Sequence, residues 1–262
     1  MRDMCRLAAY LGPEILLGDL VLAPPHGLVR QALAPRELRH ASLNADGFGF
    51  GWYAPDDEPA VYLSTLPIRS DPNLGALARS LRADLWLAFV RAATPGQRVC
   101  VANTQPFHDD ALLFAHNGFV REFATRVRPA LRRALAPEIE AHIEGTTDSE
   151  YLFALLRQVL HEDADLTMEE ALRETVARVA RWAGGAPALL NLVVADGECL
   201  YALRHAIGEP CPSLYYTTDD ERFPEAQLVA SEPLTDAGYW RPVPEHHVLV
   251  LDPEQPPELV PL

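Results

Sequence analysis

The sequence predicts one α+β domain in which two β-sheets share a core and helices cover the outside. The chain has 262 residues, which suits a single large domain. Strand patterns dominate residues 5–118, helix patterns follow from about 121 to 180, and strand patterns return in the final third. No internal repeat, low-complexity segment or linker divides this order, so we expect the domain to span residues 1–262.

The first part of the chain contains three predicted strands and one short helix. In chain order they are the strand 5–11, a segment at 44–53 that starts as a turn and runs into a strand, the strand 60–65 and the helix 74–82. Gly49 and Gly51 fall inside the second strand, where glycine often marks a close approach by another backbone or side chain. We therefore expect another group to pack directly on this strand.

Two continuous apolar runs, at 85–96 and 111–118, predict buried strands that end in polar turns. A helical region follows at about 121–143, and Pro129 and Pro137 are expected to break it.

Two later helices carry start signals. Thr147 and Glu150 have the spacing of a capping box at the start of a helix over 145–160, and Thr167 and Glu170 repeat that spacing at the next helix. The final third is predicted to hold a hairpin over 189–203, turning at Asp196-Gly197, and strands at 213–217, 226–230 and 247–251.

Charge and composition restrict the partners. A net charge of -15 repels phosphate backbones, so we expect no nucleic acid. No apolar run reaches the ~18 residues of a membrane span, and the apolar stretch 7–23 is too interrupted for a signal peptide. The spacing of the four cysteines indicates free thiols rather than disulfides, so we expect a cytoplasmic protein. The sequence does not give the oligomeric state.

Four polar clusters stand at predicted strand ends or helix starts. They are Asn44 to Gly47, Arg91 to Gly96, His116 to Gly118 and Thr147 to Ser149. For any one cluster alone, turns and caps are the better explanation. Together they indicate loops gathered around a site.

Several of these residues suit acyl transfer. Asn117 and Gly118 can supply two N–H donors to an oxyanion, although Asn-Gly is also a strong turn signal. Arg91 can clamp a carboxylate or form a buried ion pair. Asp148 can receive an ammonium group or simply cap a helix. A structural hydrogen bond is the default interpretation of His116.

Acyl transfer also needs a nucleophile, and Cys5 is the candidate. A cysteine at the N-terminus has its own base, because a free α-amine has a pKa near 8 and can take the thiol proton. The sequence contains no GxSxG, phosphate-loop or HExxH motif. His246 and His247 are adjacent and would face opposite ways on a strand, so we do not expect them to share a metal.

Five motifs in order resemble the class II glutamine amidotransferase domains of the N-terminal-nucleophile hydrolases. They are Met4-Cys5, NADGFGFGW, VRAAT, AHNG and TTDSE. The segments MCRLAAYLGP, PPHGLVRQA, QPF, YYTTDD and VASEPL look most like the stand-alone γ-glutamyl hydrolases of ergothioneine biosynthesis.

This resemblance implies a four-layer αββα sandwich of two antiparallel sheets and a reaction that needs no metal and no organic cofactor. It implies that Cys5 is the nucleophile and that Asn117 and Gly118 form the oxyanion hole. The substrate-binding set comprises Asn44, Asp46, Gly47, Arg91, Thr94, His116 and Asp148. Within it, Arg91 would bind the α-carboxylate of the γ-glutamyl group and Asp148 its α-ammonium.

The implied substrate is γ-glutamyl-hercynylcysteine sulfoxide, which would be cleaved to glutamate and hercynylcysteine sulfoxide. Three alternatives stay open: a glutaminase that passes ammonia to a separate synthase, a hydrolase of other γ-glutamyl or small amides, and an inactive binding protein of the same fold. We also hypothesise that one or two of the aromatic residues near the motifs line the pocket for the trimethylammonium half of the substrate. These are Trp52, Tyr53, Phe107 and Phe119.

The printed start conflicts with an N-terminal nucleophile, because Met1 to Met4 precede Cys5. We expect translation to begin at Met4 and Met4 to be removed, since methionine is trimmed before a small residue. Cleavage of a short propeptide before Cys5 is the other route. Either way, the mature chain would span 5–262.

Overall fold

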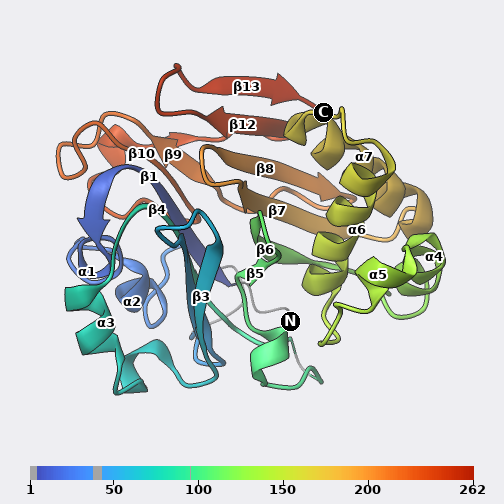
Figure 1. Cartoon of the computed structure of the whole chain (residues 1–262), viewed down its shortest axis with the longest axis horizontal. Coiled ribbons are helices and arrows are strands. Elements are labelled where there is room, and N and C mark those ends of the chain that lie inside the picture. The colour runs from blue at the N-terminus through green and yellow to red at the C-terminus, as the bar shows by residue number, and fades with distance from the viewer. Residues whose placement is uncertain (1–4, 38–42, 95) are drawn as a thin grey trace.

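The computed structural model describes residues 5–37, 43–94 and 96–262, so the expectations about Met4 and Pro95 lie outside the described residues. Its strands form two antiparallel sheets (Figure 1). The seven-stranded sheet has the order β11 (Arg241–Pro242), β9 (Tyr215–Thr217), β10 (Gln227–Ala230), β1 (Arg6–Leu16), β4 (Arg82–Val90), β2 (Phe48–Tyr53) and β3 (Pro59–Ser64). The six-stranded sheet has the order β13 (Glu258–Pro261), β12 (His247–Leu251), β8 (Leu200–Ile207), β7 (Ala188–Ala195), β6 (Leu113–Val120) and β5 (Phe107–His108).

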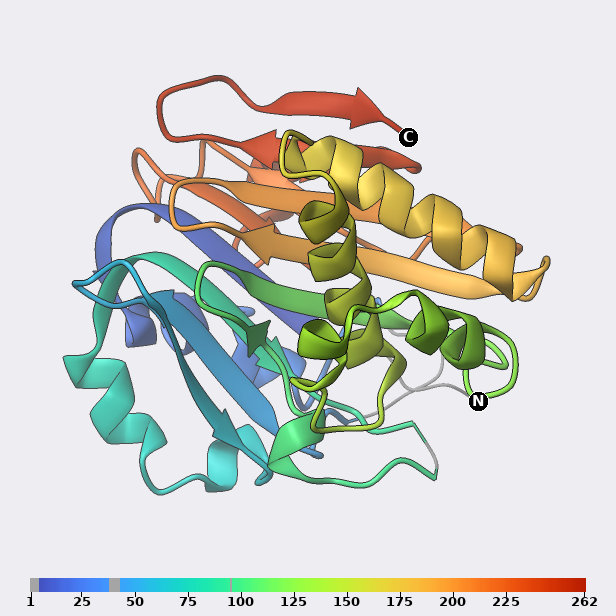
Figure 2. The ribbon, with the colours of Figure 1, turned by 45° about the vertical axis from the view of Figure 1, so that its right-hand side comes forward.

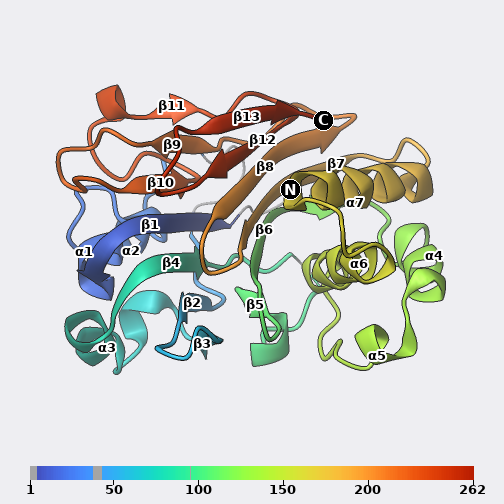
Figure 3. The same ribbon diagram turned by 45° about the horizontal axis from the view of Figure 1, so that its top comes forward.

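Helices cover the two outer faces (Figures 2 and 3). On the seven-stranded sheet lie α1 (Leu17–Val21), α2 (Leu28–Gln31) and α3 (Leu74–Ser80). On the six-stranded sheet lie α4 (Val127–Ala134), α5 (Pro137–Glu140), α6 (Asp148–Glu162) and α7 (Met168–Ala183). Short 3-10 turns occur at Ile68–Ser70, Val101–Asn103 and Ala237–Tyr239. No helix in the described part of the chain is long and apolar enough to cross a membrane.

The alternation of side chains along each strand builds this layering. In β1, Leu7, Ala9 and Leu11 enter the core between the two sheets, whereas Ala8 and Tyr10 pack under the helices. The other face of the six-stranded sheet meets α4 to α7 in a third core. Three cores between four layers confirm the predicted αββα sandwich.

The close approach expected at the two strand glycines is confirmed. A Cβ on Gly49 would lie 2.3 Å from the carbonyl oxygen of Gln105, and one on Gly51 would lie 2.9 Å from Leu113. The segment that leads into β6, and the first residue of β6, therefore pack directly on β2.

Two local predictions were wrong, and one predicted strand is longer than expected. The polar turn expected at 116–118 is absent, because these residues belong to β6, which continues to Val120. Pro129 does not break the helical region, because it falls in the first turn of α4, where its missing N–H has no intrahelical partner to lose. The strand expected over 5–11 runs on to Leu16 through an irregularity in its pairing with β4.

The two capping predictions had different outcomes. Thr167 and Glu170 form the full reciprocal capping box at α7. At α6, the Thr147 hydroxyl accepts the N–H of Glu150, but the Glu150 carboxylate instead accepts the N–H groups of Glu144 and Gly145. Glu150 thus fixes the loop that leads into α6.

Candidate active site

Strand pairing brings Cys5, the Arg91 cluster and the Asn44 cluster together at one end of three adjacent strands in the seven-stranded sheet. Arg6 at the start of β1 and Phe48 at the start of β2 both pair with Val90 at the end of β4. Cys5 precedes Arg6, and Arg91 follows Val90. Because neighbouring strands run in opposite directions, the starts of β1 and β2 lie beside the end of β4, and three segments far apart in the sequence meet there.

The Cys5 thiol is held against the first turn after β4. Its sulfur accepts the N–H of Ala92 at 3.4 Å and lies 3.6 Å from the carbonyl oxygen of Ala92. Burial raises the pKa of Cys5 to about 11, although the N–H of Ala92 and the charges of Arg91 and Arg6 oppose the rise. The charge of Asp148 raises it further. The thiol is therefore protonated at neutral pH and needs a base before it can attack.

The segment from Asn44 to Gly47 supports the Arg91 loop through its backbone. The N–H of Asp46 donates to the Arg91 carbonyl, and the Arg91 N–H donates to the Gly47 carbonyl at 2.8 Å. The Asp46 carboxylate accepts the N–H of Ala93 at 2.8 Å. Gly47 has a φ of 119°, which favours glycine. These contacts fix the loop that holds the thiol.

Asn44 is buried, and its side-chain amide has no hydrogen-bond partner among the described residues. Its backbone N–H donates to the Ala32 carbonyl at 2.8 Å. A buried amide without partners is costly, so this position is suited to a group that the described chain does not supply.

Arg91 is only 3% exposed. It contacts the carbonyl oxygens of Asp46 and Arg98 and the side chain of Gln97 at 3.3 to 3.5 Å. These are long hydrogen bonds to neutral acceptors, and the contacts found include no carboxylate. Arg91 therefore forms no ion pair with the described residues, although a buried ion pair was one of the two roles considered for it from the sequence.

Asn117 and Gly118 lie in the middle of β6 rather than in a turn. Asn117 shares the face of Leu113 and Ala115, which points toward the seven-stranded sheet. Its Nδ2 donates to the hydroxyl of Ser231 at 3.1 Å, while its Oδ1 is buried without a partner among the described residues.

Ser231 connects this amide to the nucleophile strand. Its hydroxyl also accepts the N–H of Leu7 at 3.1 Å, and its own N–H donates to the Leu7 carbonyl. Residue Leu7 is two positions after Cys5, so Ser231 sets the distance between β1 and Asn117. The sequence prediction did not include Ser231, although it lies in the VASEPL segment that carried part of the resemblance.

The backbone N–H of Gly118 points away from β7, to a side of β6 where side chains rather than a neighbouring strand accept the backbone N–H groups. The N–H groups of His116 and Val120 donate to Gln105 and Asp148 on that side. Since alternate residues of an antiparallel strand direct their N–H groups the same way, Gly118 faces the same side. A Cβ on Gly118 would lie 1.9 Å from the Leu189 carbonyl oxygen, so this position requires glycine.

His116 is buried and both its ring nitrogens are occupied. Nε2 lies 2.9 Å from the Leu189 carbonyl oxygen, and Nδ1 lies 2.9 Å from the Ser149 hydroxyl. Burial lowers the pKa of His116, although the charge of Asp148 and the Leu189 carbonyl oppose the shift. A carbonyl only accepts, so Nε2 carries the proton and Ser149 donates to Nδ1. In this arrangement His116 supports the start of α6.

Asp148 joins the start of α6 to β6. Its carboxylate accepts the N–H of Val120 at 2.7 Å and the N–H of Ser149 at 3.0 Å. Asp148 and Thr94 line a hollow of about 440 Å³. Phe119 also lines it, whereas Trp52 packs on Trp86 elsewhere.

The same hollow contains residues that the sequence prediction missed. Phe123, Arg98 and Arg128 line it. Tyr53 and Phe107 do not, because the Tyr53 hydroxyl donates to the Ala111 and Ala195 carbonyls and Phe107 packs against the helical core. No local pattern singles out Phe123, Arg98 and Arg128, because the whole fold brings two loops and the start of α4 together at this hollow.

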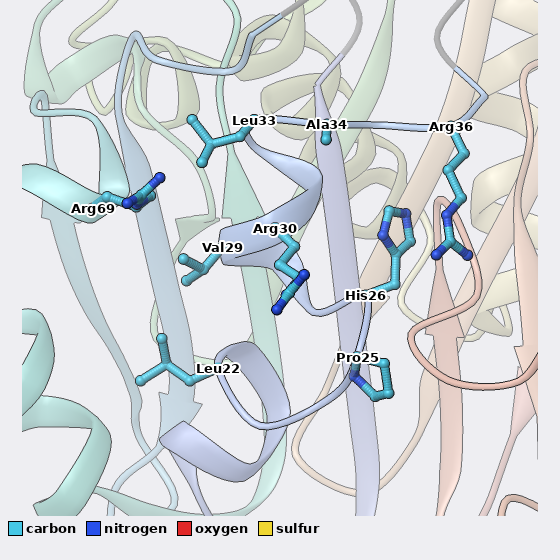
Figure 4. A pocket seen from close by; sticks show the side chains of 9 residues that line it. All are labelled: Leu22, Pro25, His26, Val29, Arg30, Leu33, Ala34, Arg36 and Arg69. Carbon is cyan, nitrogen blue, oxygen red and sulfur yellow. The ribbon is translucent and has the colours of Figure 1, made fainter.

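A second hollow, of about 530 Å³, lies beside α1 and α2 (Figure 4). Arg30, Arg36 and Arg69 line it, together with apolar side chains. None of the predicted site residues lines it, so it is separate from the site around Cys5.

Comparison with known proteins identifies close similarities. A family model described as "Glutamine amidotransferases class-II" matches residues 32–228. The chain is 32% identical to the γ-glutamyl-hercynylcysteine sulfoxide hydrolase of Mycolicibacterium smegmatis, over 94% of this chain and 95% of that protein.

Two further proteins resemble the whole chain. A probable glutamine amidotransferase of Saccharomyces cerevisiae is 29% identical over 95% of this chain and 82% of its own length. The solved structure of a glutamine aminotransferase class-II domain protein from Silicibacter pomeroyi superimposes with a TM-score of 0.72 at 29% identity, covering 98% of this chain and 100% of that one.

Proposed function

The chain belongs to the class II glutamine amidotransferase family and is an amidohydrolase of that type, and from this membership we propose that it hydrolyses γ-glutamyl-hercynylcysteine sulfoxide. Cys5 is the nucleophile in this proposal. The products are glutamate and hercynylcysteine sulfoxide. The substrate assignment rests on the relatives that carry this activity in their names at 32% identity.

One observation carries the proposal most directly: Arg91 precedes Ala92, whose N–H donates to the Cys5 sulfur at 3.4 Å, and Asp148 lines the hollow beside Thr94. A γ-glutamyl group has an α-carboxylate and an α-ammonium at one end and the scissile carbonyl at the other. Arg91 offers a guanidinium to the carboxylate, and Asp148 offers a carboxylate to the ammonium. This pairing favours a zwitterionic amino-acid group beside the nucleophile.

The proposed reaction has two halves. The free α-amine of Cys5 takes the thiol proton, and the sulfur attacks the γ-carbonyl carbon. Asn117 Nδ2 and the Gly118 N–H stabilise the oxyanion. The amide C–N bond breaks, the leaving nitrogen takes the proton from the α-ammonium, and a glutamyl thioester remains. Water, deprotonated by the same amine, then cleaves the thioester and restores the thiol.

This route requires that Cys5 be the first residue of the working protein. We therefore propose a mature chain over 5–262. The four cysteines are all free thiols, which supports the cytoplasm as the proposed place of action.

Glutamine hydrolysis is the second candidate, because the matched family is named for glutamine amidotransferases. Both candidates predict release of glutamate, so the leaving group separates them. We expect kcat/KM for γ-glutamyl-hercynylcysteine sulfoxide to exceed that for glutamine by at least about 100-fold, or about 2.7 kcal/mol. Equal or faster glutamine hydrolysis would replace our substrate assignment with a glutaminase, and Cys5→Ala is the inactive control for both substrates.

A further inference from the structure

Three potential metal ligands converge at a place outside the candidate active site. Cys211 comes from the segment between β8 and β9, and Glu245 and His246 come from the turn before β12. One ligand atom from each side chain lies within 4.8 Å of the other two. His246 lies in the turn just before β12, which begins at His247, so it joins Glu245 of the same turn and Cys211 of another segment.

The backbone fixes these ligands in place. His246 has a φ of 60°, a conformation that side chains other than glycine adopt infrequently. Its N–H donates to the Arg204 carbonyl at 2.7 Å, and its own carbonyl accepts the N–H of Leu262 at 3.0 Å. Cys211 stands between two prolines, which restrict its backbone. The strained turn thus directs His246 away from the path of the strand.

A second imidazole stands beside the first. The Nδ1 atoms of His205 and His246 lie 2.9 Å apart, and the rings meet edge to face. A histidine that binds a metal commonly uses its other ring nitrogen for a hydrogen bond that orients the ring. His205 is placed to act in this way on His246.

We propose that Cys211, Glu245 and His246 bind one divalent transition-metal ion of the zinc class. Thiolate, imidazole and carboxylate are all ligands of Zn²⁺, with bond lengths of about 2.0 to 2.3 Å. A tetrahedral ion would bring the ligand atoms to about 3.3 to 3.7 Å from one another. The side chains of Glu245 and His246 are exposed and have room to close that distance.

Binding converts the Cys211 thiol to a thiolate. The metal–sulfur bond forms as the S–H bond breaks, and the proton passes to solvent. The ion must compete with Arg204, whose Nη2 lies 3.7 Å from the half-exposed carboxylate of Glu245, a weak contact.

The ion would stabilise the side of the candidate active site that Phe119 lines. Cys211 packs in a small buried cluster with Phe119, Leu189 and Ala206. Phe119 lines the hollow beside Asp148, and the Leu189 carbonyl accepts from His116. A metal at Cys211 thus links the β12 turn to the pocket wall, which is a structural rather than a catalytic function.

Cobalt titration of the full chain tests this proposal, because a Co²⁺–thiolate bond gives a near-ultraviolet charge-transfer band. We expect this band to saturate at one Co²⁺ per chain and to be displaced by Zn²⁺. It should persist in Cys5→Ala and disappear in Cys211→Ser. His246→Ala should weaken Co²⁺ binding at least about 100-fold, beyond the 10- to 100-fold effect of losing an outer partner.

Matched substitutions separate the site from its surroundings. His247→Ala removes the adjacent imidazole and Cys199→Ser removes a half-buried thiol outside the site, and both variants should bind Co²⁺ as the parent does. Zn²⁺ should raise the Tm of the parent and of both controls, but not that of His246→Ala, whose exposed side chain can be removed without unfolding the chain. Absence of the charge-transfer band in the parent, or its survival in Cys211→Ser, would overturn the proposal.

Discussion

At the scale of the residue, the reactivity of Cys5 depends on an external base. Burial raises the pKa of its thiol to about 11, so the proton stays on the sulfur throughout the neutral range. At pH 7 only about 10⁻⁴ of the molecules would carry a thiolate unaided. The α-amine of the same residue is the proposed base and must be neutral to act. Activity should therefore rise with pH through the amine pKa near 8 rather than through the thiol pKa.

Replacing Asn117 tests the oxyanion hole. Asn117→Ala removes one of the two proposed donors and should lower kcat by about 10² to 10³. Asn191 is the matched control, because it is also buried and lies directly opposite Asn117 on β7. Both substitutions remove a buried amide, so both should lower the Tm. A kcat loss of the same size in Asn191→Ala would show that packing, not oxyanion stabilisation, explains the effect.

Asp148→Asn tests recognition of the α-ammonium. The amide keeps the size of the side chain but loses its charge, so kcat/KM for a γ-glutamyl substrate should fall by about 10- to 100-fold, as expected for a lost charged hydrogen bond. A substrate analogue without the α-amine should be hydrolysed equally by both proteins. If the substitution slows the analogue as much, Asp148 acts through the Val120 and Ser149 contacts alone.

At the scale of the element, the strand ends were predictable, but the long-range contacts between elements were not. Apolar runs located β4 and β6, and the Thr167 capping box located α7. Asn-Gly is read locally as a turn, yet β6 continues through this pair because the ladder with β7 pairs Asn117 with Asn191 and Gly118 with Leu190. Ser231 was missed because its partners on β1 and β6 are more than 100 residues away.

The packing of β2 gives a prediction at this scale. Gly49→Ala forces the Gln105 carbonyl away from β2, and we expect the free energy of unfolding to fall by about 1–3 kcal/mol. Gly75→Ala is the control, since Gly75 lies in α3 and its nearest contact is the end of the Arg79 side chain at 3.4 Å. That change should stabilise the protein by up to about 1 kcal/mol. Urea unfolding of both variants measures the difference.

Glu232 ties the segment after α2 to the end of β10. Its carboxylate lies 2.9 Å from Arg6 and 2.7 Å from His26, and accepts the N–H groups of Arg36 and Glu37. Burial alone would raise the pKa of Glu232, but these hydrogen bonds and the Arg6 charge outweigh it and hold the pKa at about 2.

Because the pKa of Glu232 is lowered in the folded protein, the free energy of unfolding should fall as the pH falls toward that pKa. Between about pH 4.5 and 2 the unfolded carboxylate binds a proton and the folded one does not, so acid favours unfolding. Glu232→Gln leaves the buried Arg6 charge uncompensated and should cost about 3 kcal/mol at pH 7. The loss should shrink toward pH 2. Glu14→Gln, which removes an exposed ion pair with Arg82, should change little at any pH.

At the scale of the whole molecule, chain order was enough to predict the layers. Strands, then helices, then strands indicated two sheets with helices outside, and the three cores confirm that arrangement. Several site residues could be proposed from the sequence because polar residues at the ends of neighbouring strands lie close together in the fold. The pocket wall could not be predicted, because the positions of Phe123 and Arg128 depend on how α4 and the turn before it pack in the whole fold.

The central claim is that an N-terminal Cys5 forms a glutamyl thioester, and peptide mass analysis of acid-quenched turnover tests it most directly. We predict an N-terminal peptide that begins at Cys5 and carries the added mass of one glutamyl group when γ-glutamyl-hercynylcysteine sulfoxide is present. A fully active protein that still begins at Met1, or a glutamyl group on any other residue, would contradict the account.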